Sequence, residues 1–514
     1  METTERHPHV ADVSFDGGDL DCGNGLLLLI RKHIDPLDRG GLLEILSTDT
    51  SVKEDLPAWC RMTKNELVSM VEDGRQRTYL VCKGGMAERR QTSPAKAALT
   101  PAGFQTLQSI VIPDRLPQAT PAPQIPPFSV MGIGSWPRPR WMLGTMHEHM
   151  EGRLSDEDFQ ATADDAVRLV VESQLRANVD VVTDGEQRRD SYSSFVAGIL
   201  DNCQLIPLTD LLPLVDDPEE FERELRALDV PAGDVRHPAV FGPLGRSRPI
   251  AVHELEFVKS LTAKPVKIAL PGPYLLTRTM WMECISDRAY ATREDLARDI
   301  VRVLREELAF LLAAGAALVQ FDEPVLTEVV FTGAKTQRSF MCGALSEKGD
   351  PATELAFARD LLNAVVAGFP LDRTAIHICR GNWTADESTC LSGNYEPLVE
   401  TLRAFNVGTY FLELCTPRAG EMEVLKSLPA NRRIGVGVVN QKLDCVESVE
   451  EIIAKVEHAV AIFGPQRVLL NPDCGFATFA DNPVSSATVA EAKLANMARA
   501  AAQLRQRYGM AIPG

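Results

Sequence analysis

Thr374-Ala375-Ile376-His377-Ile378-Cys379-Arg380-Gly381 is a short apolar run that ends in a histidine, a cysteine and a turn-forming glycine. Successive side chains of a strand point to opposite faces, so residues two apart share a face. We therefore expect His377 and Cys379 to project together from the carboxyl end of a strand. Imidazole and thiolate are ligands that Zn²⁺ favours, so the pair predicts part of a zinc site.

Two later segments end in a similar way. Residues 410–415 (Tyr-Phe-Leu-Glu-Leu-Cys) include Glu413, and residues 468–475 (Val-Leu-Leu-Asn-Pro-Asp-Cys-Gly) include Cys474. A single buried cysteine is most often only a small apolar residue. Three successive strand ends that each carry a soft or acidic ligand indicate a metal site instead. The short Cys-x-x-Cys pairs of structural zinc sites are absent from the sequence, which favours an open, catalytic site.

The set His-x-Cys, Glu and Asn-Pro-Asp-Cys-Gly resembles the zinc site of the cobalamin-independent methionine synthase family, and of its relatives that alkylate other thiols. Together the motifs cover residues 127 to 514. The resemblance implies an α/β fold, a (β/α)₈ TIM barrel of the UROD/MetE-like type, and Zn²⁺ as cofactor. Four upstream segments continue it in family order: residues 133–139 (Ile-Gly-Ser-Trp-Pro-Arg-Pro), 182–190 (Val-Thr-Asp-Gly-Glu-Gln-Arg-Arg-Asp), 270–273 and 319–324.

The sequence pattern agrees with a barrel. From Pro127 onward, apolar segments alternate with helical segments, which predicts a parallel sheet built from βα units. Residues 201–250, rich in Pro, Asp and Glu, are expected to form an insertion. Barrel enzymes place their chemistry at the carboxyl ends of the strands, where the motifs lie. The eight predicted strands are 130–133, 179–183, 266–270, 318–321, 374–378, 409–412, 434–439 and 468–470.

The resemblance implies roles for individual residues. Glu186 and Asp322 would hold the ammonium group of an amino-acid thiol, with homocysteine favoured, and backbone groups around Ser135 would hold its carboxylate. From the residues alone, Glu186 could equally form an ion pair with Arg188 or Arg189. Glu413 is the ligand expected to shift when the thiol enters. The implied zinc ligands are His377, Cys379, Glu413 and Cys474.

Two departures from the family pattern lie on the side of the alkyl donor. The folate-stacking Trp of the family corresponds to Thr279, with Trp281 nearby but out of register. The Asp-x-His that supplies an acid corresponds to residues 440–442 (Asn-Gln-Lys). Lys442 could still donate a proton or bind an anion. The zinc and thiol side is intact, so thiol alkylation is better supported than the use of methyltetrahydrofolate.

Residues 1–85 are predicted to form a separate two-layer α+β domain, joined to the barrel by a Pro-rich linker at 86–126. The domain resembles the TusA/SirA sulfur-carrier family, most closely at residues 55–61 (Asp-Leu-Pro-Ala-Trp-Cys-Arg). The reactive cysteine of that family opens the first helix. Cys22 takes this place, and at a helix N-terminus it would gain thiolate character. The domain is therefore either a persulfide carrier that uses Cys22 or a degenerate copy kept for docking or oligomerisation.

Three functions remain open. The first is a zinc-dependent methyltransferase of methionine biosynthesis, similar to 5-methyltetrahydropteroyltriglutamate–homocysteine S-methyltransferases, whose methyl group comes from a small donor or a carrier protein. The second is an enzyme of the same family that opens an epoxide or another electrophile with a thiol, with Lys442 steadying the departing oxygen. The third is a sulfur-relay or scaffold protein, supplied by a sulfur-donor protein, whose barrel binds zinc.

The composition limits the partners and the compartment. The net charge of −18 argues against nucleic acid or an acidic membrane surface as a partner. No apolar run approaches the ~20 residues of a membrane helix, and the N-terminus lacks a signal-peptide core. The eleven scattered cysteines fit a reducing compartment better than a disulfide framework. We therefore expect a cytoplasmic protein.

Overall fold

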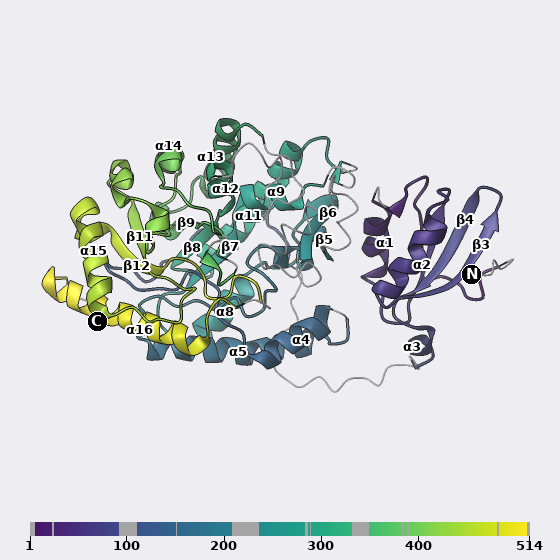
Figure 1. Cartoon of the computed structure of the whole chain (residues 1–514), viewed down its shortest axis with the longest axis horizontal. Coiled ribbons are helices and arrows are strands. Elements are labelled where there is room, and N and C mark those ends of the chain that lie inside the picture. The colour runs from purple at the N-terminus through teal and green to yellow at the C-terminus, as the bar shows by residue number, and fades with distance from the viewer. Residues whose placement is uncertain are drawn as a thin grey trace.

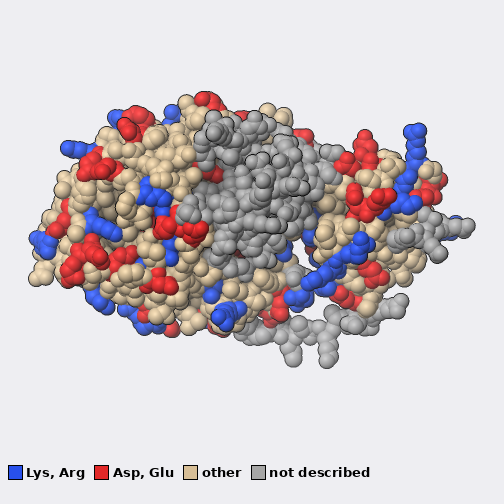
Figure 2. Space-filling view, viewed as in Figure 1, with Lys and Arg blue, Asp and Glu red and all other residues tan. Residues whose placement is uncertain are grey.

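The computed structural model describes residues 6–22, 25–91, 110–150, 152–207, 236–282, 286–287, 289–331, 349–382, 384–387, 390–480 and 483–510. The chain forms a large parallel barrel surrounded by helices and a small N-terminal α+β module (Figure 1). Acidic and basic side chains are interspersed on the visible face of both parts (Figure 2). None of the described helices combines the length and the apolarity needed to cross a bilayer.

Six parallel strands make up most of the barrel wall, in the spatial order β12-β11-β10-β9-β8-β7. Almost all of their residues are buried, as is usual for strands that are covered on both faces. The strands are β7 (Lys267–Pro271), β8 (Leu318–Asp322), β9 (Thr374–Ile378), β10 (Thr409–Leu412), β11 (Arg433–Val439) and β12 (Val468–Pro472).

Two shorter segments close the ring between β12 and β7. Val130 pairs in parallel with Leu470 of β12, and Val182 pairs in parallel with Val266. The N–H groups of Asp180 and Val181 both donate to the carbonyl of Val130, which joins the two segments to each other. The predicted barrel is confirmed, but its first two strands are reduced to single bridges.

Helices surround the barrel, and several of them begin at side-chain caps. Thr292 and Ser448 each form a capping box with the carboxylate three residues later, which fixes the first turns of α11 and α15. The apolar faces of these helices join the strands in one continuous core. The described helices include α4 (Arg140–Met150), α5 (Asp156–Arg176), α8 (Val252–Leu261), α9 (Pro273–Met280), α11 (Arg293–Ala313), α12 (Val325–Phe331), α13 (Pro351–Val366), α14 (Val399–Ala404), α15 (Val449–Phe463) and α16 (Ala487–Arg507).

The region predicted as an insertion contains an antiparallel hairpin. Its strands are β5 (Asp201–Pro207) and β6 (Arg236–Gly245), and the chain between them lies outside the described residues. β6 packs against α9 and α11 of the barrel.

The N-terminal module has the element order βαβαββ. Its sheet has the order β1-β2-β4-β3, with β1 and β2 parallel and the other pairs antiparallel. A core that includes Trp59 and Tyr79 lies between the sheet and the helices. The predicted two-layer α+β arrangement is therefore present. The elements are β1 (Val13–Asp16), α1 (Leu26–Ile34), β2 (Leu42–Ser47), α2 (Val52–Met62), β3 (Glu66–Asp73) and β4 (Gln76–Cys82).

The ends of the predicted linker are attached to the two bodies. At its start, α3 (Met86–Gln91) belongs to the module, because Arg89 forms an ion pair with Asp12. At its end, the N–H of Thr120 donates to the carbonyl of Leu312 over 3.1 Å, and Arg373 donates to the carbonyl of Thr120. We call residues 117–127 the strap, because their middle part contacts the residues at the amino ends of β8, β9, β10 and β11, opposite the motifs. Residues 92–109 lie outside the described residues.

Candidate active site

Three of the predicted ligands meet at the carboxyl end of the barrel. The ligand atoms of His377, Cys379 and Cys474 all lie within 4.8 Å of one another, and the three residues are buried. His377 lies on β9, Cys379 directly follows that strand, and Cys474 lies two residues beyond β12. The alternation of side chains in β9 therefore brings His377 and Cys379 to one face, as the sequence predicts.

The ring of His377 is oriented for a ligand. Its Nδ1 lies 3.2 Å from the carbonyl of Phe411, which can only accept, so Nδ1 carries the hydrogen. Nε2 is left with a lone pair that is buried and has no hydrogen-bond partner among the described residues. A buried polar atom without a partner is costly, and a metal ion at this place would satisfy it.

The two sulfur atoms also fit a metal ion. The pKa of Cys379 is lowered well below its usual value, chiefly by the hydrogen bond from Cys474 and also by the neighbouring His377. The pKa of Cys474 is raised because it is the donor in that contact and because it is buried. The site thus favours a thiolate, the form of cysteine that binds metals. One imidazole and two cysteines form a donor set typical of Zn²⁺.

Glu413 is not brought into this group. It is fully buried, and its Oε1 accepts a hydrogen bond of 2.6 Å from Arg418. Its Oε2 accepts from the N–H of Arg380 at 2.9 Å and from the side chain of Asn382 at 2.8 Å. The expectation that Glu413 joins the other three ligands is therefore not met in this structure, because a neighbouring cation and two N–H groups hold its carboxylate.

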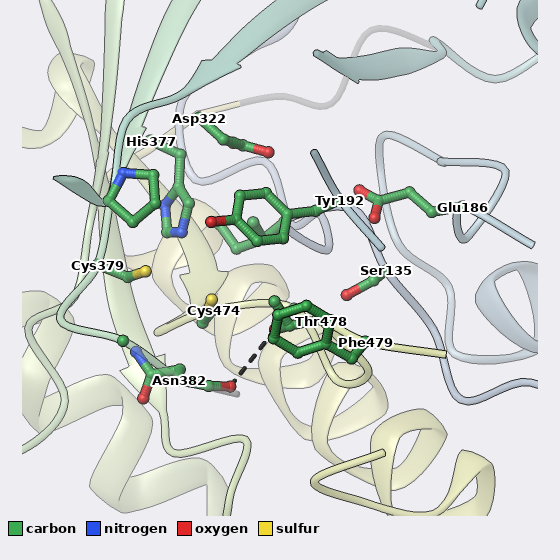
Figure 3. Close-up of a pocket in the computed structure, with 14 residues that line it drawn as sticks. Ser135, Glu186, Tyr192, Asp322, His377, Cys379, Asn382, Cys474, Thr478 and Phe479 are labelled. Carbon is green, nitrogen blue, oxygen red and sulfur yellow. Dashed lines mark hydrogen bonds between the residues drawn. The ribbon is translucent and has the colours of Figure 1, made fainter. Parts of the chain in front are cut away.

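The three ligands form one wall of a pocket that also contains the predicted substrate residues (Figure 3). Ser135, Glu186 and Asp322 line it together with His377, Cys379 and Cys474. The predicted substrate residues and three of the predicted metal ligands thus share one pocket. The other lining residues are Ile133, Tyr192, Pro324, Gly381, Asn382, Gly475, Thr478 and Phe479.

Glu186 is held in an unusual conformation. Its φ of 55° lies in the left-handed region, which non-glycine residues rarely adopt and which often marks a functional site. Its Oε2 is buried without a hydrogen-bond partner among the described residues. The alternative of an ion pair with Arg189 is weak, because Nη1 lies 4.0 Å from Glu186 while Arg189 contacts Glu254 at 2.6 Å. The pKa of Glu186 is raised to about 7, chiefly by burial; the charge of Arg189 lowers it, and that of Asp322 raises it.

Asp322 is the second buried acid of the pocket. Its Oδ1 accepts a hydrogen bond of 2.6 Å from the side chain of Gln320. Burial raises its pKa, while His377 and the bond from Gln320 act in the opposite direction. Two carboxyl groups in one buried pocket are suited to a cation that brings its own hydrogen-bond donors, such as an ammonium group.

Two glycines allow the pocket to close around its side chains. A Cβ on Gly134 would lie 2.0 Å from Oε1 of Glu186, and a Cβ on Gly475 would lie 2.1 Å from Oγ of Ser135. No larger residue fits at either position without displacing a pocket residue. Both glycines are part of the sequence motifs, and this close approach explains their presence.

The sequence did not predict the pocket residues that lie on two further loops. Two loops that pair with each other contain Tyr192, Thr478 and Phe479. Ser191 and Phe479 form an isolated antiparallel β-bridge, and the N–H of Tyr192 donates to the carbonyl of Thr478 over 3.3 Å. The rings of Tyr192 and Phe479 meet edge to face, with centroids 6.4 Å apart. Each loop directly follows a sequence motif, and its aromatic residue is the feature from which its place in the pocket could have been predicted.

Lys442 lies outside the pocket lining. Its Nζ lies 2.6 Å from Sγ of Cys390 and 3.3 Å from the carbonyl of Asp386. Its catalytic role stays a prediction, and in this structure the side chain contacts groups that are not part of the pocket lining. Thr279, at the position of the folate-stacking Trp, is buried on α9, and its hydroxyl donates to the carbonyl of Leu275.

The premise for an activated Cys22 is wrong. α1 begins at Leu26, so Cys22 does not open it. The residue is 6% exposed, and its pKa is raised to about 12, chiefly by burial and to a lesser extent by the charges of Asp55 and Asp21. A neutral, buried thiol lacks the properties of a nucleophilic sulfur carrier.

Comparisons with known proteins agree with this geometry. The model of the cobalamin-independent synthase catalytic domain matches residues 128–205 and 231–503. A methionine synthase of Sulfolobus acidocaldarius is 27% identical over 346 residues, which is 67% of this chain and 84% of the relative. A methionine synthase of Sulfurisphaera tokodaii is 28% identical over 353 residues, covering 68% of this chain and 87% of the relative.

Two solved structures share the fold. A B12-independent methionine synthase from Shewanella, in complex with selenomethionine, superposes with a TM-score of 0.55 at 22% identity, covering 74% of this chain and 99% of that one. A putative enzyme of the same kind from Listeria monocytogenes gives 0.53 at 19% identity, with the same coverage of 74% and 99%.

Proposed function

Because the chain belongs to the cobalamin-independent methionine synthase family, matched over its catalytic domain, we propose that it is a zinc-dependent methyltransferase that methylates the thiol of homocysteine. The two curated relatives described above carry the name methionine synthase, which supports homocysteine as the acceptor.

The main support for the proposal is that one pocket contains both the residues that could hold a metal and the two acids that could bind an ammonium group. One wall has His377, Cys379 and Cys474, with the lone pair of Nε2 of His377 unused. Glu186 and Asp322 line the same pocket (Figure 3). A molecule with a thiol at one end and an ammonium group at the other is complementary to this arrangement, and homocysteine is such a molecule.

The residues of the chain have distinct tasks in this proposal. His377, Cys379 and Cys474 would hold the metal, and a bound Zn²⁺ would supply the charge that keeps a substrate thiol deprotonated near neutral pH. The carbonyl of Phe411 fixes the ring of His377. Glu186 and Asp322 bind and orient the ammonium group. Tyr192 and Phe479 close the pocket and limit the access of water.

Glu413 remains our proposed fourth ligand. It lies close enough to the others that its charge raises the pKa of Cys474. Exchange of its contact with Arg418 for a contact with the metal would complete a set of four ligands. Because Arg418 can bind the carboxylate again, Glu413 is suited to be the ligand that leaves the metal when a substrate thiol binds.

The proposal is tested by supplying the zinc-loaded protein with homocysteine and a panel of methyl donors, which includes methyltetrahydrofolate and methylcobalamin, and by identifying the products by mass spectrometry. We expect methionine with at least one donor and none with Cys474→Ser. Epoxides in the same panel test the alternative alkyl transfer, which needs a group near the departing oxygen. Zinc binding without any alkylated thiol across the panel would contradict the enzymatic proposal and favour the scaffold.

For the N-terminal module we propose a TusA/SirA-like fold that serves for docking and not for sulfur transfer. The order βαβαββ supports the likeness, and the burial of Cys22 argues against a sulfur carrier. The side chain of Gln204 on β5 donates to the carbonyl of Lys32 on α1 over 3.4 Å. The ammonium of Lys32 lies 5.9 Å from the ring centroid of Phe241 on β6. These contacts place α1 against the hairpin of the barrel.

A further inference from the structure

A lysine lies in the interior of the barrel, outside the pocket lining. Lys267 is the first residue of β7 and is fully buried. Its Nζ donates to the carbonyl of Ile133 at 2.7 Å and to Oε1 of Gln320 at 2.6 Å. Among the described residues, no carboxylate lies within ion-pair distance of it. Burial of a charged group is costly, so a role beyond filling space is expected.

The contact with Gln320 determines how Asp322 is held. The ammonium of Lys267 has only donors, so it fixes the carbonyl end of the Gln320 amide toward itself. The NH₂ end must then point away, and it donates to Oδ1 of Asp322 at 2.6 Å. If the amide turned over, its NH₂ group would face the ammonium and its oxygen would face the carboxylate. Lys267 therefore sets the direction of the hydrogen bond that Asp322 receives.

Lys267 also contacts two residues that position other parts of the pocket. The carbonyl of Ile133, which it holds, is two residues before Ser135 and belongs to a residue of the pocket lining. Its ammonium lies 4.5 Å from the ring centroid of Phe411, a cation–π contact. The carbonyl of Phe411 is the group that orients His377. The same lysine thus contacts the residues that position both the acid and the metal-facing imidazole.

The electrostatic surroundings of Lys267 agree with this position. The pKa of Lys267 is lowered to about 7, chiefly by burial, although the charges of Asp322 and Glu186 act in the opposite direction. The lysine therefore lies in the field of both pocket acids, although it forms its direct contacts with neutral groups.

We propose that Lys267 is a positioning residue of the amino-acid subsite, which acts through the amide of Gln320 to hold Asp322 in the orientation that receives the ammonium group. The identity of the ligand, homocysteine, rests on the proposed function. The orientation of Asp322 does not, and it can be tested separately.

The structural test compares crystal structures of the zinc-loaded protein with Lys267→Met and with Lys264→Met. Lys264 is a matched control, because it also donates to a backbone carbonyl, that of Val179, but contacts neither acid. We expect the amide of Gln320 and the carboxylate of Asp322 to change orientation in Lys267→Met and to stay unchanged in Lys264→Met. An unchanged Gln320 and Asp322 in both variants would overturn the inference, whatever the substrate is.

The functional test measures KM and kcat for homocysteine. We expect Lys267→Met to raise KM about tenfold, the loss of roughly one charge-assisted contact, with kcat changed much less and zinc content retained. Gln320→Leu should have a similar effect, and the double variant should lose little more than either single one, because both act on Asp322 along one path. If the effects of the two single variants on KM add up in the double variant, Lys267 and Gln320 do not act on Asp322 through the same contacts. Failure of the unmodified protein to use homocysteine would reject the proposed substrate and leave the crystallographic test to decide on Lys267.

Discussion

Among the residues of the site, neutral backbone groups determine how the ligand side chains are oriented. The carbonyl of Phe411 selects the tautomer of His377 and so exposes Nε2. The ends of β9 and β12 bring Cys379 and Cys474 to the same place. Because these strands are buried and paired with their neighbours, they fix the relative positions of the three ligand atoms, which lowers the cost of binding a metal ion.

The first prediction concerns the metal. Purified protein should contain about one zinc per chain, and Cys379→Ser or Cys474→Ser should remove most of it, because a serine hydroxyl is a poor ligand at neutral pH. Metal content is measured by atomic emission after dialysis. Cys445→Ser is the matched control, because Cys445 is exposed and lies outside the ligand group. Full zinc retention in both ligand variants would reject the assigned site.

The second prediction concerns pH. The buried Glu186 has a pKa of about 7, so it is ionised above this pH and neutral below it. The ammonium group of an amino acid needs the ionised form, so affinity should fall as pH decreases through 7, by roughly tenfold one unit below the pKa. L-Methionine is the suitable ligand for calorimetry, because it carries the ammonium group but no thiol that titrates.

The control for this titration is Glu186→Gln, which keeps the shape of the side chain and cannot ionise. It should bind methionine more weakly at pH 8 and lose most of the change between pH 6 and pH 8. The same pH dependence in both proteins would show that another group is responsible.

Residue identity could be predicted better than side-chain direction. His377, Cys379 and Cys474 follow from strand alternation and motif resemblance, and they meet as expected. The contacts of Glu413 could not be predicted, because two of its partners, Arg380 and Asn382, lie more than 30 residues away in the sequence. The same holds for Lys442, whose partner Cys390 is distant in sequence.

For the secondary-structure elements, the buried β strands were the most predictable part. β9 and β10 agree with the predicted strands, and β7, β8, β11 and β12 differ by one or two residues. The predicted strands at 130–133 and 179–183 form only one bridge each, because they contact their neighbours over too short a length for a ladder. The hairpin of β5 and β6 was not predicted, since Pro and acidic residues conceal its pattern.

The strap belongs almost entirely to the segment that its composition predicted to be a Pro-rich linker. Arg373 holds it to the barrel by donating to the carbonyl of Thr120, and it also donates to those of Leu312 and Ala316. Arg373→Leu should therefore lower the free energy of unfolding by about 3 kcal/mol, because several buried carbonyls lose a charged donor. Thermal unfolding measures this, and zinc content should not change, because the strap lies at the opposite end of the barrel.

Arg359→Leu is the control for the strap. Arg359 forms an exposed ion pair with its neighbour Asp360, and such pairs contribute little to stability. An equal loss of stability in the two variants would show that the contacts of the strap contribute no more to the free energy of unfolding than an exposed ion pair does.

The position of α1 gives a prediction about its preceding cysteine. Cys22 is buried and its pKa is raised to about 12, so iodoacetamide near neutral pH should alkylate it more slowly than the exposed Cys445. Peptide mass spectrometry over a time course of the folded protein measures both rates. Labelling of Cys22 at a rate equal to that of Cys445 would restore the sulfur-carrier hypothesis.

In the whole molecule, two cores of different kinds share one chain. The module has its own core around Trp59 and Tyr79, and the barrel has a separate, continuous one. The sequence predicted this division from the change of pattern near residue 127, where the family match also begins, at residue 128. It could not predict that residues before this point are part of the barrel surface, because such contacts depend on the folded barrel.

The last prediction uses two truncated proteins that differ only in the segment before the barrel motifs. Residues 110–514 keep the strap, and residues 128–514 lose it. We expect the longer protein to bind zinc and to unfold within about 2 °C of the full chain, because the hydrogen bond of Gln204 and the cation–π contact of Lys32 with Phe241 are both long and therefore weak.

The shorter protein should unfold at a clearly lower temperature, because Arg373 loses the carbonyl of Thr120 and the N–H of Thr120 no longer reaches Leu312. If both proteins unfold like the full chain, the strap has no structural role. If both are unstable, the module supports the barrel through its contact with the hairpin, and docking is then part of the stability of the enzyme and not an addition to it.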